Sequence, residues 1–143
     1  MKKILLIILG LSVVLLADFS RDSNDTMVTD DVSKLQWQDD KIEPQSLKWI
    51  EAIAYCENLT LGNYTDWRLP NIKELTSLVD DSKIDPAIYS IFRQRGHKYW
   101  SSTTYVKSMG YAWFIRFYNG SHHTNVKSTK HYVRCVRCVR LGK

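Results

Sequence analysis

The spacing of apolar residues changes along this 143-residue chain, and that change most limits the folds it can adopt. After Pro44, a residue that suits the first turn of a helix, apolar residues recur at helical spacing. They are Leu47, Ile50, Ile53, Ala54 and Cys56. We therefore expect a helix that begins at Pro44, buries this stripe and ends near Leu59.

A second helix is expected shortly afterwards. Asn71 followed three residues later by Glu74 is a capping-box pattern, which marks a helix N-terminus. The predicted helix runs from about Ile72 to Val79. Its buried residues would be Ile72, Leu75, Leu78 and Val79.

The remainder of the chain has the two-residue alternation of strands. Residues 99–103 indicate one strand. Residues 111–117 alternate, and if Ile115 faces the core with Trp113 and Phe117, Arg116 faces outward beside Phe114. Asn119-Gly120 predicts a two-residue hairpin that returns into residues 121–126. Residues 26–29 and 34–38 are also strand-like. Two helices followed by a strand-rich half predict an α+β domain, with the helices packed on a small, mostly antiparallel sheet.

The N-terminus has the pattern of a secretory signal peptide. Two lysines precede an apolar stretch from Ile4 to Leu16, and Ala17 precedes the first acid, Asp18. Thirteen apolar residues are fewer than the roughly 20 needed to span a bilayer. We therefore predict a signal peptide over residues 1–17 and a single exported domain over residues 18–143, with no transmembrane segment after signal removal. The domain would be periplasmic or on the cell surface.

Charge is divided unevenly along the chain. All fifteen Asp and Glu lie between Asp18 and Asp85, whereas the eleven Lys and Arg from Pro86 onward are accompanied by no acid. Blocks of one sign often mark an interaction surface. Alternatively, the two halves fold together and largely neutralise each other. The charge count alone leaves both interpretations open.

Three cysteines in an exported chain suggest one disulfide and one cysteine left over. Cys56 is on the apolar stripe of the first predicted helix, and Cys135 and Cys138 are in a C-x-x-C spacing near the C-terminus. Residues three apart on a strand face opposite ways, so these two would not act as one unit. No helix follows to activate a redox thiol. A zinc site built from a cysteine with His122, His123 and His131 lacks a recognised ligand spacing.

The same alternation makes a prediction for the arginines of the last strand. If Val133 and Cys135 face the core, Arg134 faces outward and Arg137 would face inward without a partner. We therefore expect the strand to end or bulge near Val136. Arg137 and Cys138 would then belong to a tail.

Several motifs together resemble the Lcl C-terminal domain family, the tail domain of a bacterial collagen-like adhesin. They run in order through nearly all of residues 18–143 and include Trp37-Gln-Asp, Asp66-Trp-Arg-Leu-Pro70, Tyr99-Trp-Ser-Ser-Thr103 and Tyr132-Val-Arg-Cys-Val-Arg137. The pattern is also similar to the formylglycine-generating-enzyme branch of the C-type-lectin-like fold.

The resemblance carries several expectations. In C-type-lectin-like folds a first-helix cysteine pairs with one on the last strand, which implies a Cys56–Cys135 disulfide. Cys138 departs from the family pattern and is expected to be unpaired or intermolecular. The cysteine pair of the enzymatic branch is then used up, and the Glu-Pro-Asn and Trp-Asn-Asp runs of calcium-dependent lectins are missing. The resemblance thus implies binding rather than catalysis, and binding without calcium. Export disfavours a nucleic-acid partner, and we expect no cofactor or metal.

The family's adhesin is implicated in binding sulfated glycans, and the basic second half suits that chemistry. Arginine matches sulfate and carboxylate groups in a bidentate manner. The residues predicted to bind an anionic ligand are Arg116, Tyr118, His122, His123, Lys127, Lys130, Tyr132 and Arg134. The alternative is an envelope structural or protein–protein interaction domain without a small ligand. Asp22-Ser-Asn24-Asp-Thr26 also matches an acceptor motif for bacterial N-glycosylation.

Overall fold

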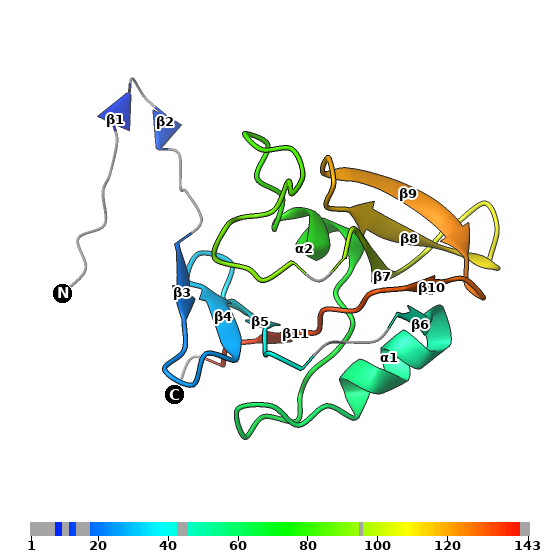
Figure 1. Ribbon diagram of the computed structural model, residues 1–143, viewed down its shortest axis with the longest axis horizontal. Coiled ribbons are helices and arrows are strands. Elements are labelled where there is room, and N and C mark those ends of the chain that lie inside the picture. The colour runs from blue at the N-terminus through cyan, green and yellow to red at the C-terminus, as the bar shows by residue number, and fades with distance from the viewer. Residues whose placement is uncertain (1–7, 10–11, 14–17, 43–45, 95, 141–143) are drawn as a thin grey trace.

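The computed structural model describes residues 8–9, 12–13, 18–42, 46–94 and 96–140. Two helices accompany strands that pair into small antiparallel sheets, so the α+β prediction is confirmed (Figure 1). Most of the predicted signal peptide, residues 1–17, lies outside the described residues. Its described parts are the paired strands β1 (Ile8–Leu9) and β2 (Ser12–Val13). The predicted helix start at Pro44 also lies outside them.

A four-stranded sheet brings the two ends of the domain together. β3 (Phe19–Arg21), β4 (Met27–Asp30), β5 (Leu35–Gln38) and β11 (Val136–Cys138) pair in the order β11-β5-β4-β3. Trp37 at its centre stands opposite Val28 on one side and Val136 on the other, and all three are fully buried. The strands predicted at residues 26–29 and 34–38 are therefore present, shortened or shifted by one residue.

The second sheet contains the predicted hairpin. β7 (Lys98–Thr104), β8 (Tyr111–Arg116) and β9 (Ser121–Val126) pair in sequence order. Arg116 pairs with Ser121, so the turn has four residues, 117–120, and the predicted two-residue turn is wrong in length. Gly120 takes a positive φ of 74°, a conformation that glycine adopts without strain. The short strands β6 (Leu47–Lys48) and β10 (Lys130–His131) pair beside this sheet.

The first helix, α1 (Trp49–Glu57), buries only part of the predicted stripe. Ile50 is 65% exposed and Ala54 is exposed, whereas Ala52 and Cys56 are completely buried. Ala52 and Cys56 are four residues apart and share one side of the helix with Trp49 and Ile53. Of the predicted stripe, Cys56 is therefore buried and Leu47 and Ile53 pack against the core, whereas Ile50 and Ala54 lie off this side of the helix.

The second helix, α2 (Ile72–Thr76), begins as predicted. The Asn71 side chain accepts a hydrogen bond from the Glu74 N–H at 2.9 Å, and Glu74 accepts one from the Asn71 N–H at 2.8 Å. The helix ends three residues earlier than predicted, because the chain turns at Ser77. Leu75 and Leu78 are still buried.

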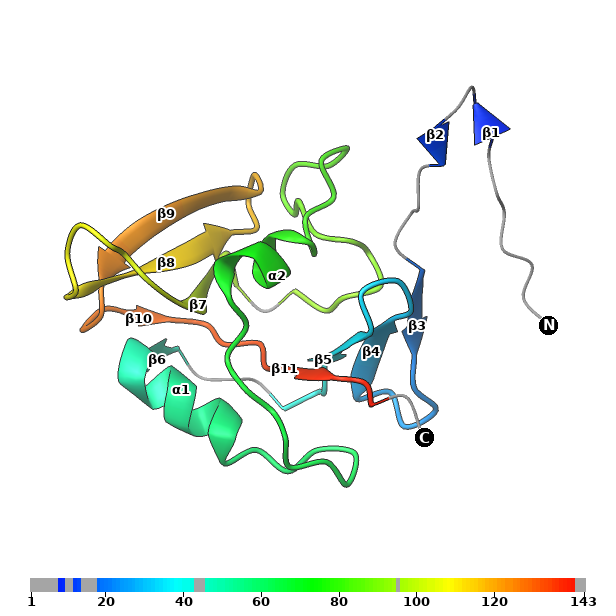
Figure 2. The same ribbon diagram turned by 180° about the vertical axis from the view of Figure 1, so that it is seen from behind.

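The buried residues form two clusters on opposite faces of the β7-β8-β9 sheet. One cluster includes Trp37, Ile115 and Phe117, and the other includes Trp100, Phe114 and the two bonded cysteines. The Cys56–Cys135 disulfide joins α1 to the residues just before β11, with a Cα–Cα distance of 5.5 Å, and the pairing implied by the resemblance is confirmed. Figure 2 shows α1 and α2 on opposite sides of the path that leads to β11.

Candidate functional site

Arg134, the residue predicted to face outward, is buried. It is only 4% exposed, and its Nη1 donates to an Asp39 carboxylate oxygen and, at 3.2 Å, to the Gln38 carbonyl. The prediction was wrong because regular strand pairing begins only at Val136. Residues 133–136 are all buried, so side-chain alternation does not apply there.

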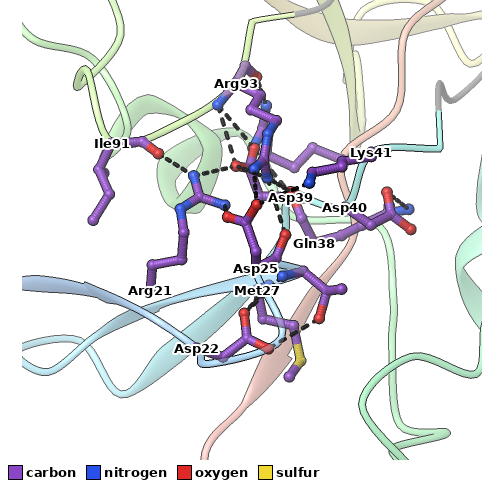
Figure 3. Close-up of polar contacts among 12 residues, drawn as sticks. Arg21, Asp22, Asp25, Met27, Gln38, Asp39, Asp40, Lys41, Ile91 and Arg93 are labelled. Carbon is purple, nitrogen blue, oxygen red and sulfur yellow. Dashed lines mark hydrogen bonds and ion pairs between the residues drawn. The ribbon is translucent and has the colours of Figure 1, made fainter.

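Asp39 is the centre of an ion cluster that includes Arg134. Figure 3 shows Arg21, Asp25 and Arg93 gathered around Asp39. Its side chain is 1% exposed and accepts from Arg21 Nη2 at 2.5 Å and from the Arg93 N–H at 3.0 Å. Arg93 also binds Asp25 at 2.5 Å, and this hydrogen bond lowers the Asp25 pKa. Acids of the first half and arginines of the second half thus neutralise each other in this cluster. This agrees with the interpretation that the two halves fold together and compensate each other's charge.

Arg137 and Cys138 belong to β11, so the prediction that they form a tail was wrong. Arg137 is 5% exposed, with Nε 2.7 Å from an Asp66 oxygen and its guanidinium 3.5 Å from the centre of the Tyr64 ring. The hydrogen bond from Arg137 lowers the Asp66 pKa. An inward arginine is tolerated because it has these partners. Cys138 is an exposed free thiol, as predicted.

The orientation predicted for β8 also needs correction. Phe114, predicted to face away from the core, is 4% exposed and packs edge-on against Trp100, whereas Trp113 is half-buried. Because both faces of this sheet are covered, alternation does not distinguish a core face from a solvent face. Arg116 shares the Phe114 face, beyond the edge of the buried cluster.

Lys98 and Arg116 stand directly opposite each other on β7 and β8. Like charges placed opposite on neighbouring strands destabilise a sheet. Neither residue forms an ion pair with a carboxylate of the described residues. The Arg116 Nε is buried and, among described residues, has no hydrogen-bond partner. Within the described part of the chain, no carboxylate therefore balances the positive charge at this end of the sheet.

A groove of about 400 Å³ lies at the same end of β7, and we call it the basic groove. No carboxylate is among the described residues that line it. They are Ser46, His97, Lys98, Asn125, Thr129, Lys130, His131 and Tyr132. Ammonium, hydroxyl, amide and imidazole groups thus converge on one cavity of a size typical of ligand sites. At its rim, His97 Nδ1 is 4.0 Å from an Asp85 oxygen.

His131 is buried and lines the basic groove. Its ring packs against Trp100 and Phe114, with centroid distances of 4.4 and 4.6 Å. Burial, assisted by the positive charge of Lys98, lowers the His131 pKa to about 4. The ring is therefore neutral at pH 7, and the groove is an unfavourable place for further positive charge.

The remaining predicted ligand residues are divided among several places. Lys130 and Tyr132 line the basic groove, and His123 is on the same sheet face, 5.9 Å from the Phe114 ring. Tyr118 is exposed at the hairpin turn, 5.9 Å from the His97 ring. Arg116 and His123 thus share the Phe114 face of the sheet, and Lys130 lines the groove beside it. The Tyr132 ring packs against Tyr99 and the other buried cluster, and Arg134 is elsewhere.

Two predicted residues lie elsewhere. His122 is on the opposite sheet face, in a mainly apolar groove of about 510 Å³ beside Trp113 and Lys73. Lys127 is occupied within the fold, with its ammonium 3.8 Å from the Trp49 ring centre and 3.0 Å from Thr104 Oγ1. Lys98 and Asn125 were not among the residues predicted from the sequence. The strand pairing Lys98–Arg116 could not be inferred without knowing the register.

Other features of the described residues bear on function. Among them, no group of three or more His, Cys, Asp or Glu side chains is arranged to hold a metal ion. Within those same ranges, no helix is both long and apolar enough to cross a membrane. Asn24 of the possible acceptor motif is exposed in the turn between β3 and β4.

Comparison with known proteins supports the resemblance found in the sequence. A search of curated proteins found no match to this chain. The family model of the Lcl C-terminal domain matches residues 26–137, which include every strand from β4 to β10, both helices and both cysteines of the disulfide. The chain therefore belongs to the Lcl C-terminal domain family.

Proposed function

We propose that this chain is an exported, non-enzymatic binding domain that recognises anionic, sulfated glycans through the basic groove. The observation that carries the proposal is the Lys98–Arg116 pair, two cations held opposite each other beside a groove without described carboxylates. Such an arrangement costs stability in the free protein. A sulfate group bound between the two cations would offset that cost.

The groove also offers the other groups that a sugar ligand requires. The hydroxyl of Thr129 and the amide of Asn125 can exchange hydrogen bonds with sugar hydroxyls, and Lys130 adds a second ammonium. Tyr132 presents a half-buried ring against which the apolar face of a sugar can pack. Charge-assisted hydrogen bonds to sulfate would supply most of the affinity.

The disulfide supports export, because such bonds persist in oxidising compartments outside the cytoplasm. It also supports the C-type-lectin-like likeness, since it joins the first helix to the end of the chain as in those folds. The enzymatic branch of that fold would need a free cysteine pair, and the Cys56–Cys135 bond leaves only Cys138 free among the described residues. We accordingly infer binding without catalysis, cofactor or calcium.

Retention on heparin tests the proposal. A Lys98→Ala/Lys130→Ala double variant removes two charges from the groove, whereas Lys73→Ala/Lys83→Ala removes two charges from α2 and the loop after it. We expect affinity for a heparin hexasaccharide to fall at least tenfold in the first variant, because charged hydrogen bonds are lost. The control should bind as the unchanged chain does.

Two further measurements make the result specific. Desulfated heparin should bind much more weakly than heparin at the same ionic strength, because the groove is proposed to read sulfate. An equal loss in both double variants would mean that net charge alone governs retention, and the groove assignment would then be abandoned.

A second function is favoured by one observation, the exposed free thiol of Cys138 on edge strand β11. An intermolecular disulfide there would make the chain an envelope structural or protein-interaction domain. A non-reducing gel that compares the unchanged chain with Cys138→Ser distinguishes the two. A dimer that the substitution removes would support this second function, and a monomer under oxidising conditions would exclude the disulfide.

A further inference from the structure

The loop between β7 and β8 carries exposed apolar side chains that the proposed glycan site does not use. We call this loop together with the first residue of β8, residues 105–111, the β7–β8 tip. Within it, Val106 is 88% exposed, Met109 is 74% exposed and Tyr111 is 38% exposed. The loop projects from the end of the sheet, drawn yellow in Figures 1 and 2, far from β3 and β4.

The tip is held in one conformation rather than being a loose connection. The Tyr105 N–H donates to the Tyr111 carbonyl at 2.9 Å, and the Tyr111 N–H donates to the Ser108 carbonyl at 3.0 Å. Its base is bonded to the next turn, where the Lys127 N–H donates to the Gly110 carbonyl at 2.9 Å. The backbone therefore keeps Val106 and Met109 in solvent, and no described segment covers them.

The charges around the tip are mainly positive. Lys107 is exposed within the loop itself, between the two apolar residues. At the base of the tip, the Lys127 carbonyl accepts a hydrogen bond from the N–H of Trp49, the first residue of α1. The exposed Lys48 directly precedes this tryptophan. Glu51 is the acid of this helix turn, and its carboxylate accepts the Lys48 N–H at 2.9 Å.

We infer that the β7–β8 tip docks on an anionic lipid surface, with Val106 and Met109 inserted among the headgroups. Exposed apolar side chains flanked by lysine are the combination that such surfaces bind, since apolar burial and attraction to anionic lipid add together. A protein partner is a poorer fit. Stable protein interfaces need roughly 800 Å² from each side, and a narrow projecting turn offers little flat area.

Vesicle binding of the full chain tests this inference. The probes are vesicles of phosphatidylglycerol mixed with phosphatidylcholine, and vesicles of phosphatidylcholine alone. On the mixed vesicles, we expect Val106→Ser/Met109→Ser to weaken partitioning at least tenfold and Lys107→Ala to weaken it about fivefold. The unchanged chain should bind phosphatidylcholine vesicles less tightly.

Ile84→Ser is the matched control, because Ile84 is 76% exposed in a loop that contains Asp80, Asp81 and Asp85. Its partitioning should stay within twofold of the unchanged chain. Every variant keeps the apolar stretch 4–16, so binding through that stretch alone would leave all variants equal and would overturn the inference. A loss in Ile84→Ser as large as in the tip variant would overturn it too.

Two more readouts separate this inference from other interpretations. If the tip variant changed the sedimentation of the chain but not vesicle binding, the tip would be a contact between copies and the lipid inference would be wrong. The tip variant should also keep full heparin affinity. Failure of the lipid inference is therefore distinguishable from failure of the proposed glycan site.

Discussion

Arg134 and Asp39 are predicted to contribute unequally to stability, although they form one ion pair. Removing Arg134 leaves Asp39 with Arg21 Nη2 and the Arg93 N–H as donors. Removing the Asp39 carboxylate leaves Arg134, 4% exposed, without its counter-ion. The substitution at Asp39 should therefore be the more damaging one.

The magnitudes follow from these contacts. Breaking a buried ion pair so that one charge stays uncompensated costs about 3–5 kcal/mol, which we expect for Asp39→Ala. Arg134→Met keeps much of the side-chain volume and leaves two carbonyls without their donor, those of Gln38 and Arg93, so we expect about 2 kcal/mol. For a domain of this size, the first loss corresponds to a fall in melting temperature of about 10 °C or more.

Urea unfolding followed by tryptophan fluorescence measures both values, and the Asp39→Ala/Arg134→Met double variant gives the coupling between the two residues. The double variant should be less destabilised than the sum of the single ones. Arg134→Met should keep its heparin affinity when folded. A loss below about 1 kcal/mol for Asp39→Ala, or a larger loss for Arg134→Met, would refute this account of the cluster.

Two further predictions concern other parts of the fold. Replacing both Cys56 and Cys135 with alanine should cost about 4.5 kcal/mol in urea unfolding, because the cysteines are 79 residues apart and the unfolded chain regains that loop entropy; an unchanged midpoint would contradict this. Because the His131 pKa is lowered from 6.5 to about 4, the unfolded state binds more protons in that window. Through this residue, stability should therefore fall by up to about 3 kcal/mol as pH decreases from 6.5 to 4. His131→Phe should remove the slope between pH 6.5 and about 5, above the range where carboxylates such as Asp25 and Asp66 contribute, and a slope that persists there would assign it to other groups.

The sequence predicted features that depend on local pattern. The capping box of Asn71 and Glu74 and the hairpin after β8 need only neighbouring residues, and both are present. The disulfide pairing came from the family resemblance rather than from spacing. The expectation that Cys138 is left unpaired within the chain followed from its departure from the same family pattern.

Features that depend on register or on distant partners were not predictable in this way. Arg137 seemed unfit for a core position because its partner Asp66 is 71 residues away in sequence. Phe114 was assigned to the solvent side because alternation cannot reveal that both faces of a sheet are covered. Lys98 was missed because only the observed pairing places it opposite Arg116.

The most direct test of the proposed function is a titration of the isotope-labelled chain with a heparin-derived oligosaccharide, monitored by nuclear magnetic resonance. We predict shifts of the backbone amide signals of Lys98, Asn125 and Lys130, which line the basic groove. The Arg116 Nε–H signal should shift with them. That side-chain signal is informative because the group has no hydrogen-bond partner among the described residues. Shifts confined to the Trp113 groove or to the β7–β8 tip, or no shifts at saturating ligand, would contradict the account.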